Sequence, residues 1–384
     1  MTSRHYYSPF IKYSLLLLAF LVIAALISAL SFTHYNSPPT STKQLASNPH
    51  PTAVTKPSST TKPDHPQPLK TELYTFGALH SNFIKMEQDG IIKSAPFALF
   101  LTKILGYEKK IKKGTYRFSN LLSTYQILNL LVAGREESVL FTIVEGYDLY
   151  DIDNNLFAAG LIPTKGQFAA YSHQKKTLAI IEKELDFPPA LRGTLISSEG
   201  FLYPNSYQVR LSTVNEDLTR LALAQFKTTL VPILINHAPP EKWIDLMKIS
   251  SLIEKETFLT NEKPLIASVL YNRLRINMKL RYDPTIIYAL KKAGLYENYL
   301  TSEGFFDIKK EHFTFTSPYN TYTVNGLPQT PISSFTLTSL NAALNPAESP
   351  YLFFVARSRT DLAKGHDFSR SYEEHLEKIE AYQR

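Results

Sequence analysis

The chain of 384 residues contains no cysteine, so disulfide bonds and thiolate chemistry are excluded and stability must come from an apolar core. Its 10 histidines show no spacing typical of metal ligands, so we expect no metal site, and we expect no cofactor. No internal repeat is present. Charged side chains are absent from one long apolar run, and that run indicates where the protein resides.

The apolar run covers residues 14–32, and a span of about 20 apolar residues is long enough to cross a bilayer. Arg4 and Lys12 precede it, so the positive-inside rule leaves the N-terminus in the cytoplasm and everything after the run outside. A cleaved signal peptide is the alternative, but the run exceeds the usual apolar region of such peptides and no small-x-small cleavage site ends it. We therefore expect a cytoplasmic N-terminus over 1–12 and a single transmembrane helix over 13–33.

Residues 34–70 form a linker rich in Pro, Ser, Thr and Lys, with almost no bulky apolar side chains. Such a segment cannot form a core, and where it is stiff it extends by about 3.1 Å per residue. We expect it to hold the folded part away from the membrane. The rest of the chain is long enough for a small domain over 71–137 and a larger one over 138–384.

The net charge of +7 suits an anionic polymer or a membrane surface. The basic residues are scattered apart from Lys109, Lys110, Lys112 and Lys113, and such a cluster is more often a solvated face than a binding site. Nucleic acid is not an expected partner, because the membrane anchor places these lysines outside the cytoplasm.

Hydrophobic periodicity and turn residues predict an α+β fold. In the small domain we expect strands over 73–76 and 114–118 and helices over 95–105 and 124–132. In the larger domain, Asp283 is expected to cap a helix that starts with Pro284, since Asp favours the N-cap and Pro the first turn. The other expected elements are strands over 139–144 and 351–355, helices over 243–258, 264–275, 284–292 and 336–344, and a loop over 365–369 before a C-terminal helix.

Two glutamates close together on the helix over 243–258 are predicted to face different surroundings. Glu256 shares the i, i+3, i+4, i+7 stripe with Ile249, Leu252 and Ile253, whereas Glu254 points away from that stripe toward solvent. Burial raises the pKa of a carboxyl, so Glu256 is a candidate general acid. The alternative is that a neighbouring Arg or Lys neutralises Glu256 and that it only holds the helix in place.

A series of short motifs follows in a fixed order along most of the chain. The strings are Val144-Glu145-Gly146, Glu199-Gly200-Phe201-Leu202-Tyr203-Pro204-Asn205-Ser206-Tyr207, Ile253-Glu254-Lys255-Glu256-Thr257, Tyr271-Asn272-Arg273-Leu274, Asp283-Pro284-Thr285, Ser317 to Tyr322, Gly326-Leu327-Pro328 and Leu344-Asn345-Pro346. Their order resembles that of the endolytic murein transglycosylases of the MltG (YceG-like) family.

The resemblance implies a LysM-like small domain and a larger, mixed α/β, lysozyme-like catalytic domain. It implies cleavage of the bond between N-acetylmuramic acid and N-acetylglucosamine within nascent peptidoglycan strands, leaving 1,6-anhydro ends, with Glu256 as acid and then as base. The expected location is the bacterial inner (cytoplasmic) membrane, with the catalytic domain on the periplasmic side. The expected partners are peptidoglycan strands, the membrane and peptidoglycan polymerases.

The same motifs bring polar residues that are candidates for binding the sugar polymer. Each has a structural alternative: Arg273 could pair with Glu254 or Asp283, the tyrosines could belong to the core, and Asp283 could be only a helix cap. His366 lies in a loop that could border the cleft. The substrate-binding candidates are Glu199, Asn272, Arg273, Tyr319, Asn320 and Tyr322.

Two departures from the family pattern affect the loops. Asn205-Ser206-Tyr207 stands where the family more often has Asp-Thr-Tyr, and the segment 329–334 is poorer in proline and glycine than the family version. These differences concern loop shape and subsite preference.

Two rival functions are compatible with the sequence. One is a hydrolytic muramidase with Glu256 as acid and Glu199 or Asp283 as base. The other is a non-catalytic, membrane-tethered scaffold that binds glycan through its small domain.

Overall fold

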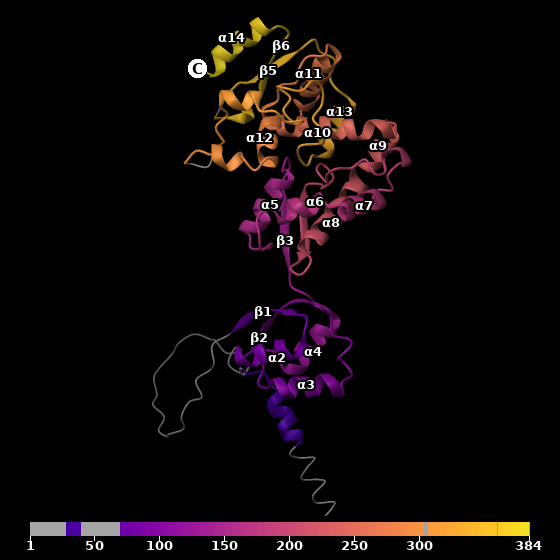
Figure 1. Ribbon diagram of the computed structural model, residues 1–384, viewed down its shortest axis with the longest axis vertical. Helices are drawn as coiled ribbons and strands as arrows, with labels where there is room; N and C mark the ends of the chain where they lie inside the picture. The colour runs from indigo at the N-terminus through magenta and orange to yellow at the C-terminus, as the bar shows by residue number, and fades with distance from the viewer. Residues whose placement is uncertain (1–27, 40–69, 303–305, 359, 384) are drawn as a thin grey trace, which may run out of the picture. The chain divides into compact units, whose positions relative to one another are not determined.

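The structure is a computed structural model, and it describes residues 28–39, 70–302, 306–358 and 360–383. The predicted cytoplasmic N-terminus, the first part of the predicted transmembrane helix and most of the predicted linker lie outside the described residues. Within these limits the chain divides into two compact units, residues 1–138 with 210–212, and residues 139–209 with 213–384. Each is described by itself below (Figure 1).

The small unit pairs a two-stranded antiparallel sheet with helices. Tyr74 of β1 lies opposite Tyr116 of β2, and both are buried in one apolar cluster that includes Phe83 and Leu128 of the helices. Residues 28–36 add a further helical segment. The elements are β1 (Thr71–Phe76), α2 (Leu79–Gln88), α3 (Ala95–Ile104), β2 (Gly114–Ser119) and α4 (Thr124–Ala133).

Local sequence signals set the ends of these helices. Ser94 accepts a hydrogen bond from the Phe97 N–H at the start of α3, and Ser123 and Gln126 form a capping box at the start of α4. α4 ends at Gly134, which adopts a left-handed conformation with φ 69°. The predicted strands and helices of this domain are confirmed, with boundaries within two residues of those expected.

The larger unit is mostly helical, with two small two-stranded sheets, of which the second, between residues 353–356 and 366–369, is antiparallel. Its core gathers around α10 and α11, where Leu252, Ile253, Ile266 and Leu270 are fully buried. The elements are β3 (Ser138–Ile143) paired with β4 (Asn205–Arg210), β5 (Phe353–Ala356) paired with β6 (His366–Ser369), and the helices α5 (Leu149–Ala158), α6 (Gln167–Ser172), α7 (Lys175–Glu184), α8 (Val214–Thr229), α9 (Val231–His237), α10 (Trp243–Glu256), α11 (Lys263–Arg275), α12 (Asp283–Lys292), α13 (Leu337–Leu344) and α14 (Tyr372–Gln383).

The predicted helices of this domain are found close to their expected limits, but one loop is not. The segment 365–369 was expected to be irregular, and that prediction is wrong. Residues 366–369 form β6, which pairs with β5 in the register Val355 opposite Asp367. The alternation of apolar and polar residues in this segment is too short to predict a strand. The segment becomes a strand because it pairs with β5.

One apolar stretch among the described residues, Val214–His237, has the length and composition of a membrane span. It comprises α8 and α9, and 44% of its most apolar window is buried within the protein. Leu223, Phe226 and Leu234 belong to the main core of the larger unit. We therefore interpret α8 and α9 as core helices.

Candidate functional site

The candidate site is a cleft of about 420 Å³ in the larger unit, at the end of α10. Glu256 is the last residue of this helix, and the following Thr257 is extended with φ −151°. The Glu256 side chain therefore projects from the last position of α10, where the backbone leaves the helix. The polar residues lining the cleft are Glu256, Arg273, Arg281, Tyr282, Asp283, Tyr322, His366, Tyr372 and His375.

The carboxyl of Glu256 is largely removed from solvent, and one of its two oxygens, the shielded Oε1, has no hydrogen-bond partner among the described residues. Burial, reinforced by the charge of Asp283, raises the pKa of Glu256 to about 8, while Arg273 and Lys255 act in the opposite direction. The negative end of the α10 dipole also disfavours a carboxylate there. The carboxyl is therefore mostly protonated at neutral pH.

Glu254 has the opposite surroundings from those predicted, because it is buried and not exposed. Its Oε1 accepts from Lys263 Nζ at 3.1 Å, in an ion pair whose side chains are each 3% exposed. Its Oε2 accepts from the Thr336 N–H at 2.8 Å and from Ser339 Oγ at 2.6 Å, at the N-terminus of α13. The prediction failed because α10 is buried on more than one face: α13 covers the side that its apolar stripe left open.

Asp283 and Tyr322 form a pair in the cleft. The Tyr322 hydroxyl donates to Asp283 Oδ1 at 2.6 Å. α12 begins at Asp283 itself, and its N-cap, Tyr282, makes no side-chain capping bond, so the prediction that Asp283 caps this helix is wrong. Its carboxylate is instead directed at the cleft, where it adds negative charge beside Glu256.

Arg273 lines the cleft but does not pair with Glu254 or Asp283 as either structural alternative suggested. Its Nε donates to the Leu352 carbonyl at 2.6 Å, and Nη1 donates to the Leu280 carbonyl. The guanidinium carbon lies 5.3 Å from the centre of the Phe353 ring. Burial lowers its pKa, but an arginine remains charged at neutral pH. The residue thus holds β5 in place and also supplies positive charge near Glu256.

Asn272 and Asn320 lie beside the cleft without being part of its lining. The Asn272 amide donates to the carbonyls of Ser349 and Tyr351 at 2.8 and 2.9 Å. The Asn320 amide donates to the Phe315 carbonyl at 2.8 Å, and its oxygen accepts from the Tyr322 N–H at 3.0 Å. Both amides therefore position main chain, and a direct contact with substrate stays a prediction for each.

Tyr319 and Glu199 are buried in the interior of the larger unit. The Tyr319 ring is 1% exposed and lies 4.9 Å from that of Tyr288. Glu199 is 1% exposed, its Oε2 accepts from the Leu149 N–H at 3.1 Å, and burial, reinforced by Asp148, raises its pKa to about 8. Neither residue lines the cleft that contains Glu256.

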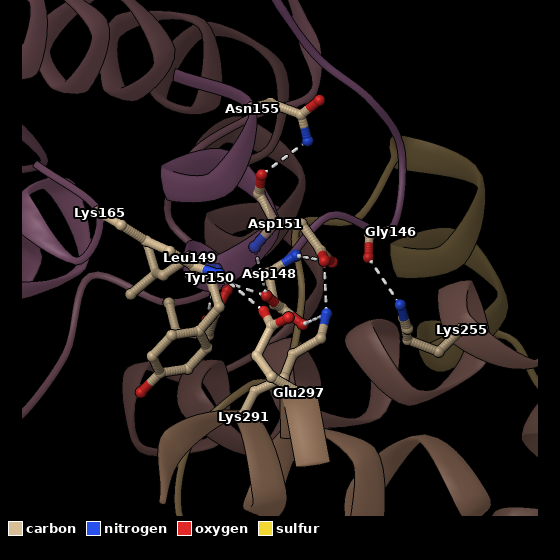
Figure 2. Close-up of polar contacts among 11 residues, drawn as sticks. Gly146, Asp148, Leu149, Tyr150, Asp151, Asn155, Lys165, Lys255, Lys291 and Glu297 are labelled. Atoms are coloured by element: carbon tan, nitrogen blue, oxygen red, sulfur yellow. Dashed lines mark hydrogen bonds and ion pairs between the residues drawn. The ribbon is translucent and has the colours of Figure 1, made fainter. Parts of the chain in front are cut away.

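The surroundings of Glu199 form an ionic network that joins α5 to α12 (Figure 2). Asp148 caps α5 by accepting from the Tyr150 and Asp151 N–H groups, and Lys291 Nζ donates to its carboxylate at 2.7 Å. In the same view, Lys255 donates to the Gly146 carbonyl at 3.1 Å, which ties α10 to the end of β3. Asp148, Asp151, Lys255 and Lys291 therefore have structural roles, because they connect neighbouring segments of the larger unit.

The prediction that His366 could border the cleft is confirmed, whereas its partner Glu262 and the nearby His375 were not singled out from the sequence. His366 lines the cleft. Its Nδ1 lies 2.8 Å from Oε2 of Glu262, and its N–H donates to Oε1 of the same residue at 2.7 Å. Glu262 accepts from Thr257 Oγ1 at 3.3 Å as well, which links β6 to the residue directly after Glu256. His375 of α14 completes this wall. Glu262 and His375 lie outside the motifs quoted from the sequence, so no sequence signal pointed to them.

Comparisons with known proteins agree on one family. The model described as the YceG-like family matches residues 78–381. Two relatives from strains of Streptococcus pneumoniae and one from Bacillus subtilis are each named endolytic murein transglycosylase. The first two are 30% identical over 292 residues, which cover 71% of this chain and 51% of each relative. The third is 27% identical over 313 residues, which cover 77% of this chain and 80% of the relative.

The chain therefore spans about half the length of the Streptococcus relatives. Among solved structures, a YceG-like protein from Listeria monocytogenes is similar, with a TM-score of 0.53 and 26% sequence identity. The similarity covers 80% of this chain and 99% of the Listeria chain. Since the family model matches well over half of the residues, the chain belongs to the YceG-like family.

Proposed function

We propose that this protein is an endolytic lytic transglycosylase that cuts within nascent peptidoglycan strands, between N-acetylmuramic acid and N-acetylglucosamine. Family membership and the printed names of the relatives support the reaction class. The observation that carries the proposal is the Glu256 carboxyl, which lines a cleft, has one shielded oxygen without a hydrogen-bond partner among the described residues, and has a pKa raised to about 8. A carboxyl that keeps its proton at neutral pH meets the main requirement for a general acid.

In the proposed reaction one carboxyl carries out both proton transfers. Protonated Glu256 donates to the glycosidic oxygen, the bond from C1 to that oxygen breaks, and positive charge develops at C1. The resulting carboxylate then takes the proton of the 6-hydroxyl of the same sugar while O6 bonds to C1, which closes the 1,6-anhydro ring. No water is consumed, so the second carboxylate of ordinary glycosidases is not needed as nucleophile or base.

The charges next to Glu256 suit both proton transfers, the donation to the glycosidic oxygen and the later removal of the 6-hydroxyl proton. The negative charge of Asp283 favours the protonated form of Glu256 before the reaction and stabilises the cationic sugar at the transition state. Arg273 stabilises the Glu256 carboxylate once the proton has been transferred. Tyr322, which donates to Asp283, keeps that carboxylate in place.

We propose direct substrate contacts for Arg273 and Tyr322, which line the cleft. Asn272 and Asn320 would act one layer behind, by holding the loops that shape the cleft, since their amides already bind main-chain carbonyls. Tyr319 and Glu199 would support the sugar-binding surface from the interior.

We further propose that the chain is anchored in the bacterial inner membrane by the apolar run 14–32, with both folded units on the periplasmic side. The small unit, with its two-stranded sheet and helices, would be a LysM-like domain that binds glycan. Peptidoglycan polymerases are the proposed partners at the membrane, because an anchored enzyme meets strands as they emerge.

The test is mass spectrometry of peptidoglycan digested by the full chain and by Glu256→Gln. The wild type should release fragments with 1,6-anhydro ends, and the variant should lose about 10²- to 10⁴-fold in rate, the usual worth of general acid–base assistance. Glu241→Gln is the matched control, since Glu241 is an exposed residue outside the cleft. Retained cleavage by Glu256→Gln, or no cleavage by the wild type, would refute the proposal and favour a glycan-binding scaffold.

A hydrolytic muramidase remains the second candidate because Asp283 lies in the same cleft as Glu256 and could activate a water molecule. Glu199 is a poorer candidate for that role, since it is buried away from the cleft lining. The same digestion separates the reactions: a hydrolase leaves reducing ends, whereas a transglycosylase leaves anhydro ends.

A further inference from the structure

α3 of the small unit presents large apolar side chains to solvent. Phe100 is 57% exposed and Ile104 is 65% exposed. Together with Phe97 they follow the i, i+3, i+7 spacing of one helix face, which we call the α3 face. Exposed apolar side chains that gather on one face indicate a binding surface rather than chance exposure.

The helical segment 28–36 packs against this same face. The Phe32 and Tyr35 rings lie 5.9 and 5.7 Å from the Phe97 ring, and Figure 1 shows the segment directly beside α3. Lys93, just before α3, donates to Ser37 Oγ at 2.8 Å. The end of the apolar run 14–32 is thus in contact with the α3 face.

Hydrogen bonds to α4 fix the segment from a second side. Thr124 Oγ1 donates to the Tyr35 carbonyl at 3.2 Å, and the Tyr125 N–H donates to Asn36 Oδ1 at 2.9 Å. Both donors belong to the first turn of α4, where backbone N–H groups need partners. The orientation of the small unit relative to the end of the apolar run is therefore determined by contacts with two helices.

The charges around the α3 face favour an anionic lipid surface over other partners. α3 contains no acidic residue, and Lys103 is exposed on it. Lys109, Lys110 and Lys113 follow shortly after the helix and are exposed as well, beside a single exposed acidic residue, Glu108. Aromatic and aliphatic side chains flanked by lysines are typical of helices that lie in a membrane interface.

We propose that the α3 face is a membrane-docking surface, on which Phe100 and Ile104 enter the interfacial region of an anionic bilayer while the nearby lysines contact lipid phosphates. This inference rests on the anchoring proposed above and not on the reaction. If the run 14–32 crosses the bilayer, the contacts of Phe32 and Tyr35 bring the α3 face to the bilayer surface. The small unit is then held against the membrane and does not swing on its anchor.

The experiment uses the full chain at one copy per lipid nanodisc containing phosphatidylglycerol. Because the chain has no cysteine, Phe100→Cys provides a single site for an environment-sensitive fluorophore. Spin-labelled lipids should quench the label at position 100 by roughly twofold or more, with a blue shift, as expected for interfacial burial. Leu73→Cys is the matched control: Leu73 is 41% exposed on β1, on the other side of the small unit, and its label should stay unquenched.

Two further experiments identify what covers the α3 face. Quenching should be weaker in discs of neutral phosphatidylcholine. It should also be weaker for the variant Lys109→Gln/Lys110→Gln/Lys113→Gln. Unchanged quenching in both experiments would refute the proposed contact between these lysines and lipid phosphates. Lys112 is left in place because it donates to the Ala133 carbonyl. Quenching that requires two copies per disc would identify a second chain as the occupant and overturn the proposal.

An unquenched label in a protein that stays in the disc overturns docking and leaves anchoring intact. A protein that does not associate with discs at all overturns both. None of these measurements depends on glycan cleavage, so each failure is distinguishable from failure of the proposed reaction.

Discussion

Replacing Glu256 by glutamine should remove catalysis and at the same time stabilise the protein at neutral pH. The folded protein holds this carboxyl at a pKa of about 8, whereas its ordinary value is 4.5. Below the ordinary pKa the group is protonated in both the folded and the unfolded state and has no effect. As the pH rises from there toward 8, the unfolded chain loses the proton and the folded protein does not, so the free energy of unfolding falls through this window.

The expected size follows from the same values. At pH 7 the wild-type carboxyl costs on the order of 3 kcal/mol of stability, which Glu256→Gln should recover, because glutamine carries no charge to desolvate. The gain should be close to zero near pH 4 and should level off above pH 8. If Glu256 is the general acid proposed above, this destabilisation is an example of the trade-off between activity and stability.

Urea unfolding of the full chain in detergent, at a series of pH values, measures this difference. Trp243 is the single tryptophan, is 5% exposed and starts the helix that ends at Glu256, so its fluorescence reports on the relevant region. Only the difference between variant and wild type is interpreted, because Glu199 and Asp148 also have raised pKa values. Glu241→Gln should change stability by no more than about 0.5 kcal/mol at any pH.

If Glu256→Gln were no more stable than the wild type at pH 7, the carboxyl would not be desolvated and the argument for a general acid would fail. The rate of the wild type supplies an independent check. Cleavage should decline as the pH rises through about 8, since the acid loses its proton there.

Two further variants test the charges around the site. Asp283→Asn removes the negative charge that raises the pKa of Glu256, so the decline of the rate should move to lower pH; an unshifted pH–rate profile would show that this charge does not act on Glu256. Lys263→Met leaves Glu254 buried without its partner and should cost about 3–5 kcal/mol, measured by urea unfolding. Adding Glu254→Gln to Lys263→Met should restore part of that loss, and a loss below about 1 kcal/mol in the single variant would mean that the ion pair is not desolvated.

Much of the local structure could be predicted from the sequence. α4 and α12 end within one residue of their expected limits, at Gly134 and just before Gly294, because caps and periodicity act over one or two turns. The stripe that contains Glu256 was likewise visible, because the side chains on one face of a helix are set by its pitch.

The failures concern contacts between distant segments. Glu254 was expected in water, but Lys263 and the start of α13 surround it, and nothing in its own helix indicates that neighbour. Asp283 was expected to cap a helix and instead accepts from Tyr322. His366 was expected in a loop, and pairing with β5 makes it part of a strand in the cleft wall.

By itself, the sequence determined the helices, their apolar faces and the glutamate that ends α10, because those features depend on residues a few positions apart. Only the tertiary structure decided which glutamate is neutralised and which keeps its proton. The physical reason is that the surroundings of a carboxyl are made by residues on other helices: Lys263 forms an ion pair with Glu254, whereas burial and Asp283 raise the pKa of Glu256 and Arg273 lowers it.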